Sequence, residues 1–214
     1  MRVLVIGANG KIGRHLIKIL AQESDHTPKA LIRKEEQKPY FDELGVETIV
    51  ASLEGSVEDL ATAMEGSDAV VFTAGSGGNT GPDKTLLIDL DGAAKAIEAA
   101  GKLNTGRFIM VSAIFADRRE YWSESMAPYY VAKHHADNIL RASGLNYTIV
   151  RPGGLLDEPG TGKVAIAHNL EAGSVPREDV ARVLYHSLDN EKTYNKSFDL
   201  NSGKDDIKNA LGSL

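Results

Sequence analysis

The most constraining feature of this sequence is a glycine-rich turn that directly follows its first apolar run. The run Arg2–Ile6 is short and apolar, and the segment GANGKIG at Gly7–Gly13 follows it before an amphipathic pattern over Lys11–Gln22. A strand that turns tightly into a helix over glycines lets a pyrophosphate approach the backbone at the partially positive helix N-terminus. The motif therefore predicts a dinucleotide-binding turn. The alternative is that the glycines serve only to make a tight turn.

Short β-branched runs alternate with longer helical patterns, which is typical of βαβ units in a parallel sheet. The expected strands are Arg2–Ile6, Lys29–Ile32, Thr48–Ala51, Ala69–Thr73, Phe108–Val111 and Tyr147–Val150, with a closing strand near Ser197–Leu200. The expected helices are Lys11–Gln22, Glu35–Leu44, Val57–Met64, Lys84–Ala100, Tyr129–Ala142 and Arg177–Leu188. These elements predict an α/β fold: a three-layer Rossmann fold with a doubly wound parallel sheet and a late edge strand.

The pattern predicts one NAD(P)-binding domain over residues 1–214. The 64 residues from Arg151 onward are short for a separate substrate domain. We therefore expect residues 151–214 to complete the sheet and to roof the substrate pocket. Two local signals support the helix boundaries: Ser56 and Asp59 fit a capping box, and Gly144 fits a helix C-cap.

The composition of the chain argues against several classes of function. The chain has no cysteine, which excludes disulfides and thiolate chemistry, and its formal net charge is −6, which argues against a nucleic-acid partner. No apolar run approaches membrane-spanning length, and the N-terminus does not resemble a signal sequence. We therefore expect a cytoplasmic protein, a monomer or homodimer, with a small-molecule substrate and without a nucleic-acid or membrane partner.

The residues after the second expected strand indicate which dinucleotide binds. An NAD site usually places an acidic residue there for the ribose 2′-hydroxyl, whereas this chain has Arg33 and Lys34. Arg33 can pair bidentately with a 2′-phosphate and stack on adenine. The sequence therefore favours NADP(H), with a solvated strand-end charge as the other interpretation of Arg33.

Two further turns are expected at the carboxyl edge of the sheet. Ser52 and Leu53 follow the third strand and would flank the adenine, while Ala74 and Gly75 follow the fourth and would flank the nicotinamide ribose. Ordinary loop packing explains the same residue types. The glycine-rich segment 75–81 lies between a strand and a helix, so we expect a functional loop rather than a domain boundary.

A tyrosine and a lysine four residues apart form the candidate catalytic pair. Tyr129 and Lys133 share one face of an expected helix, and Ser112 ends the fifth strand. A lysine cation is expected to lower the pKa of the phenol toward the working range, and it can also hydrogen-bond the nicotinamide ribose. Ser112 would then orient a substrate carbonyl. Because His134 and His135 are adjacent on the helix and point apart, we expect no metal site.

The motifs together resemble the atypical short-chain dehydrogenase/reductase group, which includes epimerase/dehydratase-like and NmrA-like proteins. The matching elements are the Gly7–Gly13 turn, Arg33, Ser112, the Tyr129/Lys133 pair, the stretch from Ser143 to Leu155 that ends in Arg-Pro-Gly-Gly-Leu, and Asp179-Val180-Ala181. The resemblance implies the sheet order 3-2-1-4-5-6. Many members carry an aspartate where this chain has Ser52, which leaves one adenine contact open.

The resemblance also implies roles for individual residues. The pyrophosphate and adenine side would be bound by Gly7, Asn9, Gly10, Lys11, Ile12 and Gly13, and the 2′-phosphate by Arg33. The nicotinamide carboxamide would be approached by Pro152, Gly153, Gly154 and Leu155, and catalysis would fall to Ser112, Tyr129 and Lys133. The loop 115–126 would form a pocket wall or lid, with ordinary surface structure as the alternative.

The leading functional hypothesis is an NADP(H)-dependent oxidoreductase that acts on a small carbonyl or alcohol. A non-catalytic NADP(H)-binding sensor or regulatory protein, as among NmrA-like members, is the alternative, since fold alone does not fix function. A flavin or quinone reductase that uses NADPH without Tyr129 is a third possibility. Nucleotide-sugar epimerisation is not expected, because the larger epimerases carry a substantial substrate domain after the Rossmann part.

Overall fold

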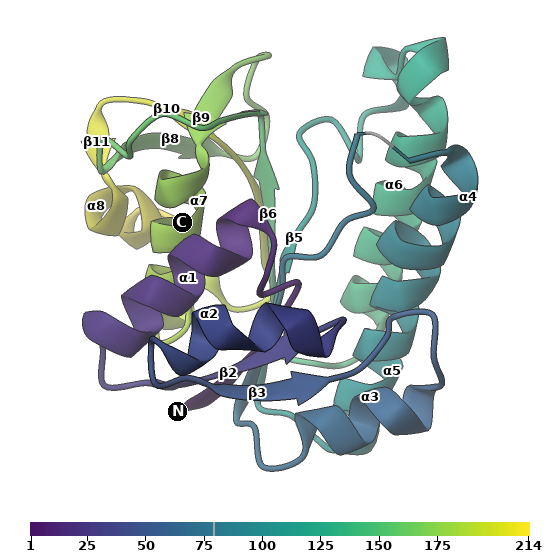
Figure 1. Ribbon diagram of the computed structural model, residues 1–214. Coiled ribbons are helices and arrows are strands. Elements are labelled where there is room, and N and C mark those ends of the chain that lie inside the picture. Colours follow the sequence, from purple (N-terminus) through teal and green to yellow (C-terminus); the bar gives the residue numbers. More distant parts are fainter. Residues whose placement is uncertain (79) are drawn as a thin grey trace.

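The computed structural model describes residues 1–78 and 80–214. Asn79, which belongs to the glycine-rich segment 75–81, lies outside the described residues. The central element is a twisted sheet with helices on both faces (Figure 1). The expected three-layer α/β fold is therefore confirmed.

Nine strands of the described chain form this sheet in the order β11-β8-β10-β6-β5-β4-β1-β2-β3. They are β1 (Arg2–Ile6), β2 (Thr27–Ile32), β3 (Glu47–Val50), β4 (Ala69–Phe72), β5 (Arg107–Val111), β6 (Tyr147–Pro152), β8 (Lys163–Ala167), β10 (Lys196–Ser202) and β11 (Asp205–Asp206). Strands β1 to β6 pair in parallel in the expected order 3-2-1-4-5-6. Strand β10 continues this direction beside β6, and β8 and β11 add antiparallel pairs at that edge.

Strand β1 shows why the sheet needs helices on both sides. Val3 and Val5 belong to one buried cluster, and Leu4 and Ile6 belong to the other, because successive side chains point to opposite faces. The first cluster packs against α1 (Lys11–Gln22) and α7 (Arg177–Ser187), and the second against α3 (Val57–Met64), α5 (Ala93–Lys102) and α6 (Ala127–Ala142). A parallel strand that is buried on both faces has a continuous run of apolar residues in its sequence, as β1 does.

The structure corrects two of the expected helices. Glu35–Leu44 is a 3₁₀ turn at Glu35–Gln37 followed by the short α2 (Lys38–Asp42). Lys84–Ala100 is divided into α4 (Pro82–Lys84), a π-helix at Thr85–Gly92, and α5. A π-helix is wider than an α-helix and has no distinct apolar period, so the sequence pattern does not reveal it.

The segment after Arg151 is also richer in structure than expected. Besides α7 and β10 it contains β8, β11, the two-stranded parallel pair β7 (Gly154–Leu156) and β9 (Ser174–Pro176), and α8 (Ile207–Gly212). These elements are two to six residues long, which is too short for a periodic pattern to identify.

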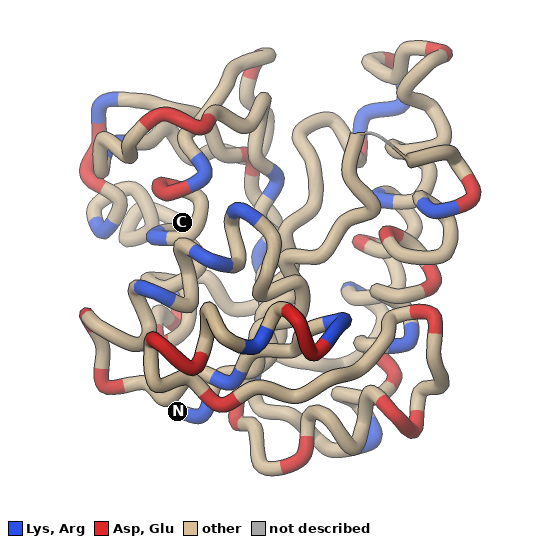
Figure 2. Tube along the Cα trace, in the orientation of Figure 1, with Lys and Arg blue, Asp and Glu red and all other residues tan. Residues whose placement is uncertain are grey.

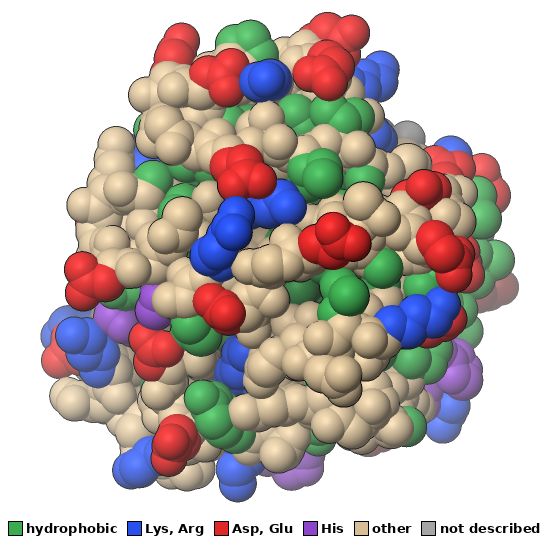
Figure 3. All heavy atoms as spheres, turned by 90° about the horizontal axis from the view of Figure 1, so that it is seen from below, with side chains coloured by type: hydrophobic (Ala, Val, Ile, Leu, Met, Phe, Trp, Pro, Cys, Tyr) green, Lys and Arg blue, Asp and Glu red, His purple; other side chains and the backbone are tan. Residues whose placement is uncertain are grey.

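Charged residues of both signs are interspersed along the chain trace (Figure 2). The face seen from below in Figure 3 carries acidic, basic and hydrophobic side chains in alternation. In the part of the chain that the structure describes, no helix is both long and apolar enough to cross a membrane.

Candidate functional site

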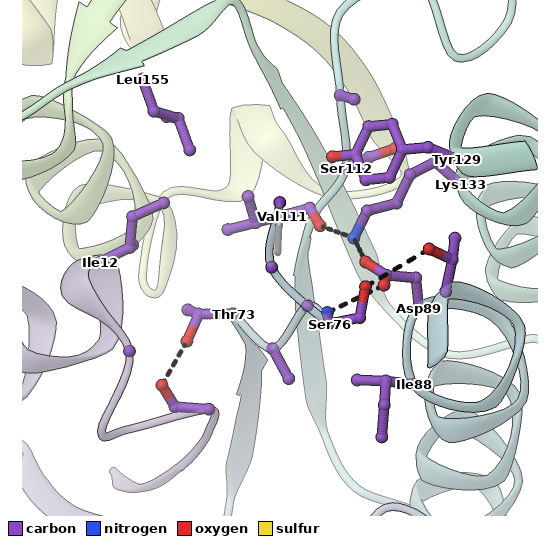
Figure 4. A pocket seen from close by; sticks show the side chains of 18 of the residues that line it. Ile12, Thr73, Ser76, Ile88, Asp89, Val111, Ser112, Tyr129, Lys133 and Leu155 are labelled. Carbon is purple, nitrogen blue, oxygen red and sulfur yellow. Dashed lines mark hydrogen bonds and ion pairs between the residues drawn. The ribbon is translucent and has the colours of Figure 1, made fainter. Parts of the chain in front are cut away.

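A cavity of about 980 Å³ lies at the carboxyl ends of the central strands. It extends from the glycine turn after β1 and Arg33 after β2 to the segments that follow β4, β5 and β6. Figure 4 shows Ser112, Tyr129 and Lys133 together on one side, with Ile12 and Leu155 across from them. Parallel strands bring these segments together because their carboxyl ends meet at one sheet edge.

Gly7 shows why the turn after β1 requires glycine. Its φ is +82°, and a Cβ added there would lie 2.6 Å from the Ala74 backbone nitrogen. Its carbonyl accepts hydrogen bonds from the Gly10 amide at 2.9 Å and the Thr73 hydroxyl at 3.2 Å. The loops after β1 and β4 are therefore packed backbone against backbone beside the cavity.

The N-terminus of α1 opens toward this cavity. No side chain caps it, its first turn contains no acidic residue, and Gly10, Lys11 and Ile12 line the cavity. The first amides of a helix lack intrahelical acceptors and attract anions. This arrangement fits the diphosphate of a dinucleotide.

Most of the predicted cofactor residues line the cavity. They are Gly7, Asn9, Gly10, Lys11, Ile12, Arg33, Leu53, Ala74, Gly75, Lys133, Pro152, Gly153, Gly154 and Leu155. Gly13 does not: a Cβ there would lie 2.3 Å from the Gly7 carbonyl oxygen, so this glycine serves close packing of the helix on the turn. Ser52 lies at a separate hollow beside β3.

Arg33 and Gln37 line the end of the cavity next to β2. The exposed Arg33 follows β2, and its backbone amide donates to the Gln37 side chain at 2.9 Å. The 3₁₀ turn Glu35–Gln37 therefore fixes the backbone at Arg33, whose side chain is exposed and lines the cavity.

Ser112, Tyr129 and Lys133 lie together at the other end of the cavity (Figure 4). Ser112 is 3 % exposed, and within the described chain its hydroxyl has no hydrogen-bond partner. The Lys133 ammonium lies 5.8 Å from the centre of the Tyr129 ring. The same end of the cavity therefore offers a serine hydroxyl, a phenol and a cation to a ligand.

Lys133 is paired with a residue that the sequence reasoning missed. Its ammonium nitrogen lies 3.1 Å from Asp89 Oδ1 in the π-helix and 3.4 Å from the Val111 carbonyl oxygen. Asp89 also accepts a hydrogen bond from the Ser76 amide at 2.9 Å. The signal in the sequence was one acidic residue inside the apolar run Leu86-Leu87-Ile88-Asp89-Leu90.

Lys133 acts to lower the pKa of Tyr129, but burial outweighs it, and the pKa of the phenol in the chain alone is raised. Burial raises the pKa of the phenol, the Lys133 cation opposes the rise, and the negative charge of Asp89 adds to it. Burial alone would lower the pKa of Lys133, but the Asp89 carboxylate, 3.1 Å away, raises it. Lys133 therefore remains charged, while Tyr129 remains a neutral phenol.

The loop 115–126 forms only part of the cavity wall. Ser125 and Met126 line the cavity. The residues before them contact one another within the loop. The Trp122 indole donates to the Phe115 carbonyl at 2.8 Å, and its ring stacks on Tyr130. Ile114 and Tyr130, which lie just outside this loop in the sequence, also line the cavity.

The fold and the cavity define an NAD(P)-binding Rossmann protein. A sequence profile described as NAD(P)H-binding matches residues 7–191, and the chain belongs to this family. The chain is 56 % identical, over the full length of both, to YhfK of Bacillus subtilis (strain 168), which is named an uncharacterized sugar epimerase.

Two solved structures extend this likeness. A candidate NAD-dependent epimerase/dehydratase from Bacillus halodurans superposes with a TM-score of 0.95 at 44 % identity over all of both chains. The oxidoreductase ylbE from Lactococcus lactis superposes with a TM-score of 0.91 at 33 % identity, over 100 % of this chain and 96 % of that one. The relatives thus carry both oxidoreductase and epimerase names.

Proposed function

We propose that this protein is an NADP(H)-dependent oxidoreductase that acts on a small carbonyl or alcohol. The observation that carries the proposal is the shared cavity: Ser112, Tyr129 and Lys133 lie at one end, and the glycine turn and Arg33 lie along the rest. A protein that only sensed the cofactor would not need a tyrosine and a serine hydroxyl in the same cavity as a buried lysine.

The cofactor would be held by the glycine turn, Arg33, the loop after β4, and the segment Pro152–Leu155. Arg33 supports the choice of NADP(H), because it is the cation at the position where a 2′-phosphate would lie. The bound nicotinamide would supply or accept the hydride. The protein's contribution is binding, orientation and electrostatics.

The chain's own residues would manage the substrate oxygen. Ser112 would donate a hydrogen bond to that oxygen, and Tyr129 would donate a proton to it in reduction or remove one in oxidation. Lys133 would hold the positive charge beside the phenol. One hydride at carbon and one proton at oxygen convert a carbonyl into an alcohol, so atoms and electrons balance.

The test is NADPH consumption by the purified protein with a panel of small aldehydes, ketones and quinones, followed by absorbance. Turnover that falls by about 10²–10⁴-fold in Tyr129→Phe would support the proposal, because general acid catalysis contributes that much. Tyr130→Phe is the matched control, since Tyr130 lines the same cavity and stacks on Trp122.

Two outcomes would contradict the proposal. Tight NADPH binding without turnover of any carbonyl would indicate a sensor. Undiminished quinone turnover in Tyr129→Phe would indicate a reductase that dispenses with the phenol. A sugar substrate that is epimerised while the cofactor returns to its starting state would instead agree with the name of the Bacillus subtilis relative.

A further inference from the structure

The ion pair between Asp89 and Lys133 is almost fully buried. The side chains are 2 % and 5 % exposed, and their charged atoms are 3.1 Å apart. The two residues come from different elements, the π-helix Thr85–Gly92 and α6, which pack closely against each other. Figure 4 shows the pair at the inner wall of the cavity, next to Tyr129.

Asp89 is fixed from a second direction. Its Oδ2 accepts the Ser76 amide at 2.9 Å, and a Cβ added to Gly75 would come within 3.1 Å of its Oδ1. The residue therefore ties the loop after β4 to Lys133. A buried carboxylate held by a cation and a backbone amide costs far less than an isolated buried charge.

The ion pair with Asp89 weakens the effect of the Lys133 charge on the pKa of Tyr129. A lysine alone would attract a phenolate, but a carboxylate 3.1 Å from the ammonium cancels much of that attraction. The groups that face Tyr129 are Asp89 from the π-helix and Lys133, Tyr130 and Asp137 from its own helix. Asp137 is itself paired with Arg151 on β6, at 3.0 Å, which reduces its effect on the phenol.

We propose that Asp89 is a positioning residue that holds Lys133 in a buried neutral pair, so that Tyr129 is kept protonated as the proton donor to a carbonyl oxygen. This inference rests on the proposed function and adds the protonation state of its general acid. A carbonyl that gains a hydride at carbon must take a proton at oxygen. The neutral phenol supplies that proton, an alcohol leaves, and solvent returns the proton to the phenolate.

The direct test is the ionisation of Tyr129 without any substrate. Tyrosinate absorbance is titrated with pH in the parent and in Tyr129→Phe, and the difference isolates Tyr129. In an Asp89→Asn background the same difference is expected to move to lower pH, with about tenfold more phenolate at a fixed alkaline pH. In a Lys133→Met background, Tyr129 is expected to stay protonated at every pH at which the protein remains folded.

Asp91→Asn is the matched control. Asp91 lies on the same π-helix and pairs with Lys95 at 2.9 Å, and it is 54 % exposed, so its loss should leave the Tyr129 titration unchanged. Near-ultraviolet circular dichroism of each variant checks that the fold is intact. Loosened packing would move the titrations of Asp89→Asn and Lys133→Met in the same direction, whereas the charge argument requires opposite directions.

An Asp89→Asn titration that stays with the parent or moves to higher pH would overturn this inference and leave the carbonyl turnover result untouched. Conversely, absence of carbonyl turnover in a protein whose Tyr129 titrates as expected would refute the proposed function alone. A further readout follows in the active protein: the pH at which carbonyl reduction declines on the alkaline side should move to lower pH in Asp89→Asn and stay with the parent in Asp91→Asn.

Discussion

Asp157 bridges Lys11 and Arg177: its Oδ2 lies 2.5 Å from the Lys11 ammonium, and its Oδ1 lies 2.6 Å from the Arg177 guanidinium. Lys11 begins α1 and Arg177 begins α7, and both residues line the cavity. The Lys11 hydrogen bond lowers the pKa of Asp157, so this carboxylate stays ionised in mild acid. A negative charge therefore lies beside the place where a diphosphate would bind.

We expect Asp157→Asn to tighten NADPH binding about two- to fivefold at low salt, because Lys11 becomes available to phosphate. The gain should fade as salt is added, since these side chains are exposed and screened. Fluorescence titration at two ionic strengths checks both statements. Weaker binding in the variant would show instead that the bridge supports the bound conformation.

Arg33→Ala is expected to weaken NADPH binding by about 10–100-fold and to weaken NADH binding much less. The loss corresponds to charge-assisted hydrogen bonds to a 2′-phosphate, which NADH lacks. Lys38→Ala serves as the control, because Lys38 is a nearby exposed cation that does not line the cavity. Equal losses for both cofactors would rule out the 2′-phosphate contact.

Gly7→Ala should destabilise the protein by about 2–5 kcal/mol, combining a left-handed backbone with a Cβ that clashes with the Ala74 backbone. Gly45→Ala is the matched control. Its φ is +68°, but nothing lies within 4 Å of the added Cβ, so only the backbone cost of about 1–2 kcal/mol remains. Urea unfolding measures the loss of unfolding free energy in each variant. Similar losses in Gly7→Ala and Gly45→Ala would contradict the packing argument.

The buried Arg151 joins Asp137 on α6 at 3.0 Å and also pairs with Asp117 in the loop after β5. Arg151→Met removes the closest cation of both carboxylates and leaves them only Arg141 at 3.8 Å and Arg118 at 3.9 Å, so it should cost about 3–5 kcal/mol of unfolding free energy. Adding Asp137→Leu is expected to recover part of the loss. Strict additivity of the two substitutions would argue against the pair.

His186 predicts a pH dependence of stability. Burial lowers the pKa of this imidazole below its ordinary value, and the cations Lys208 and Arg182 add to the effect. The unfolded state then binds more protons between the two pKa values, so stability falls as pH drops below about 6.5. The decline in urea midpoint between neutral and mildly acidic pH should be smaller in His186→Gln. An identical decline in the parent and in His186→Gln would show that groups other than His186 cause the pH dependence of stability.

Local rules explain why much of the fold could be predicted. The apolar run Arg2–Ile6 and the helix Lys11–Gln22 have the bounds expected for them. The capping box is present at Ser56, whose hydroxyl accepts the Asp59 amide at 3.1 Å, and Gly144 has φ +76° after α6. Each of these features depends on a few consecutive residues, so the sequence contains all the information needed.

The site was predictable only in part, because a sequence gives the order of residues along the chain and not the partners across it. The Gly7–Gly13 motif, Arg33 and the Tyr129/Lys133 spacing follow from periodicity and known chemistry, and parallel strands bring them to one sheet edge. By contrast, Asp89 faces Lys133 from 44 positions away, through a π-helix that leaves no periodic signal. The sequence thus determined which groups are available, while tertiary packing decided which charges are paired, because burial and distance set the electrostatics of Tyr129.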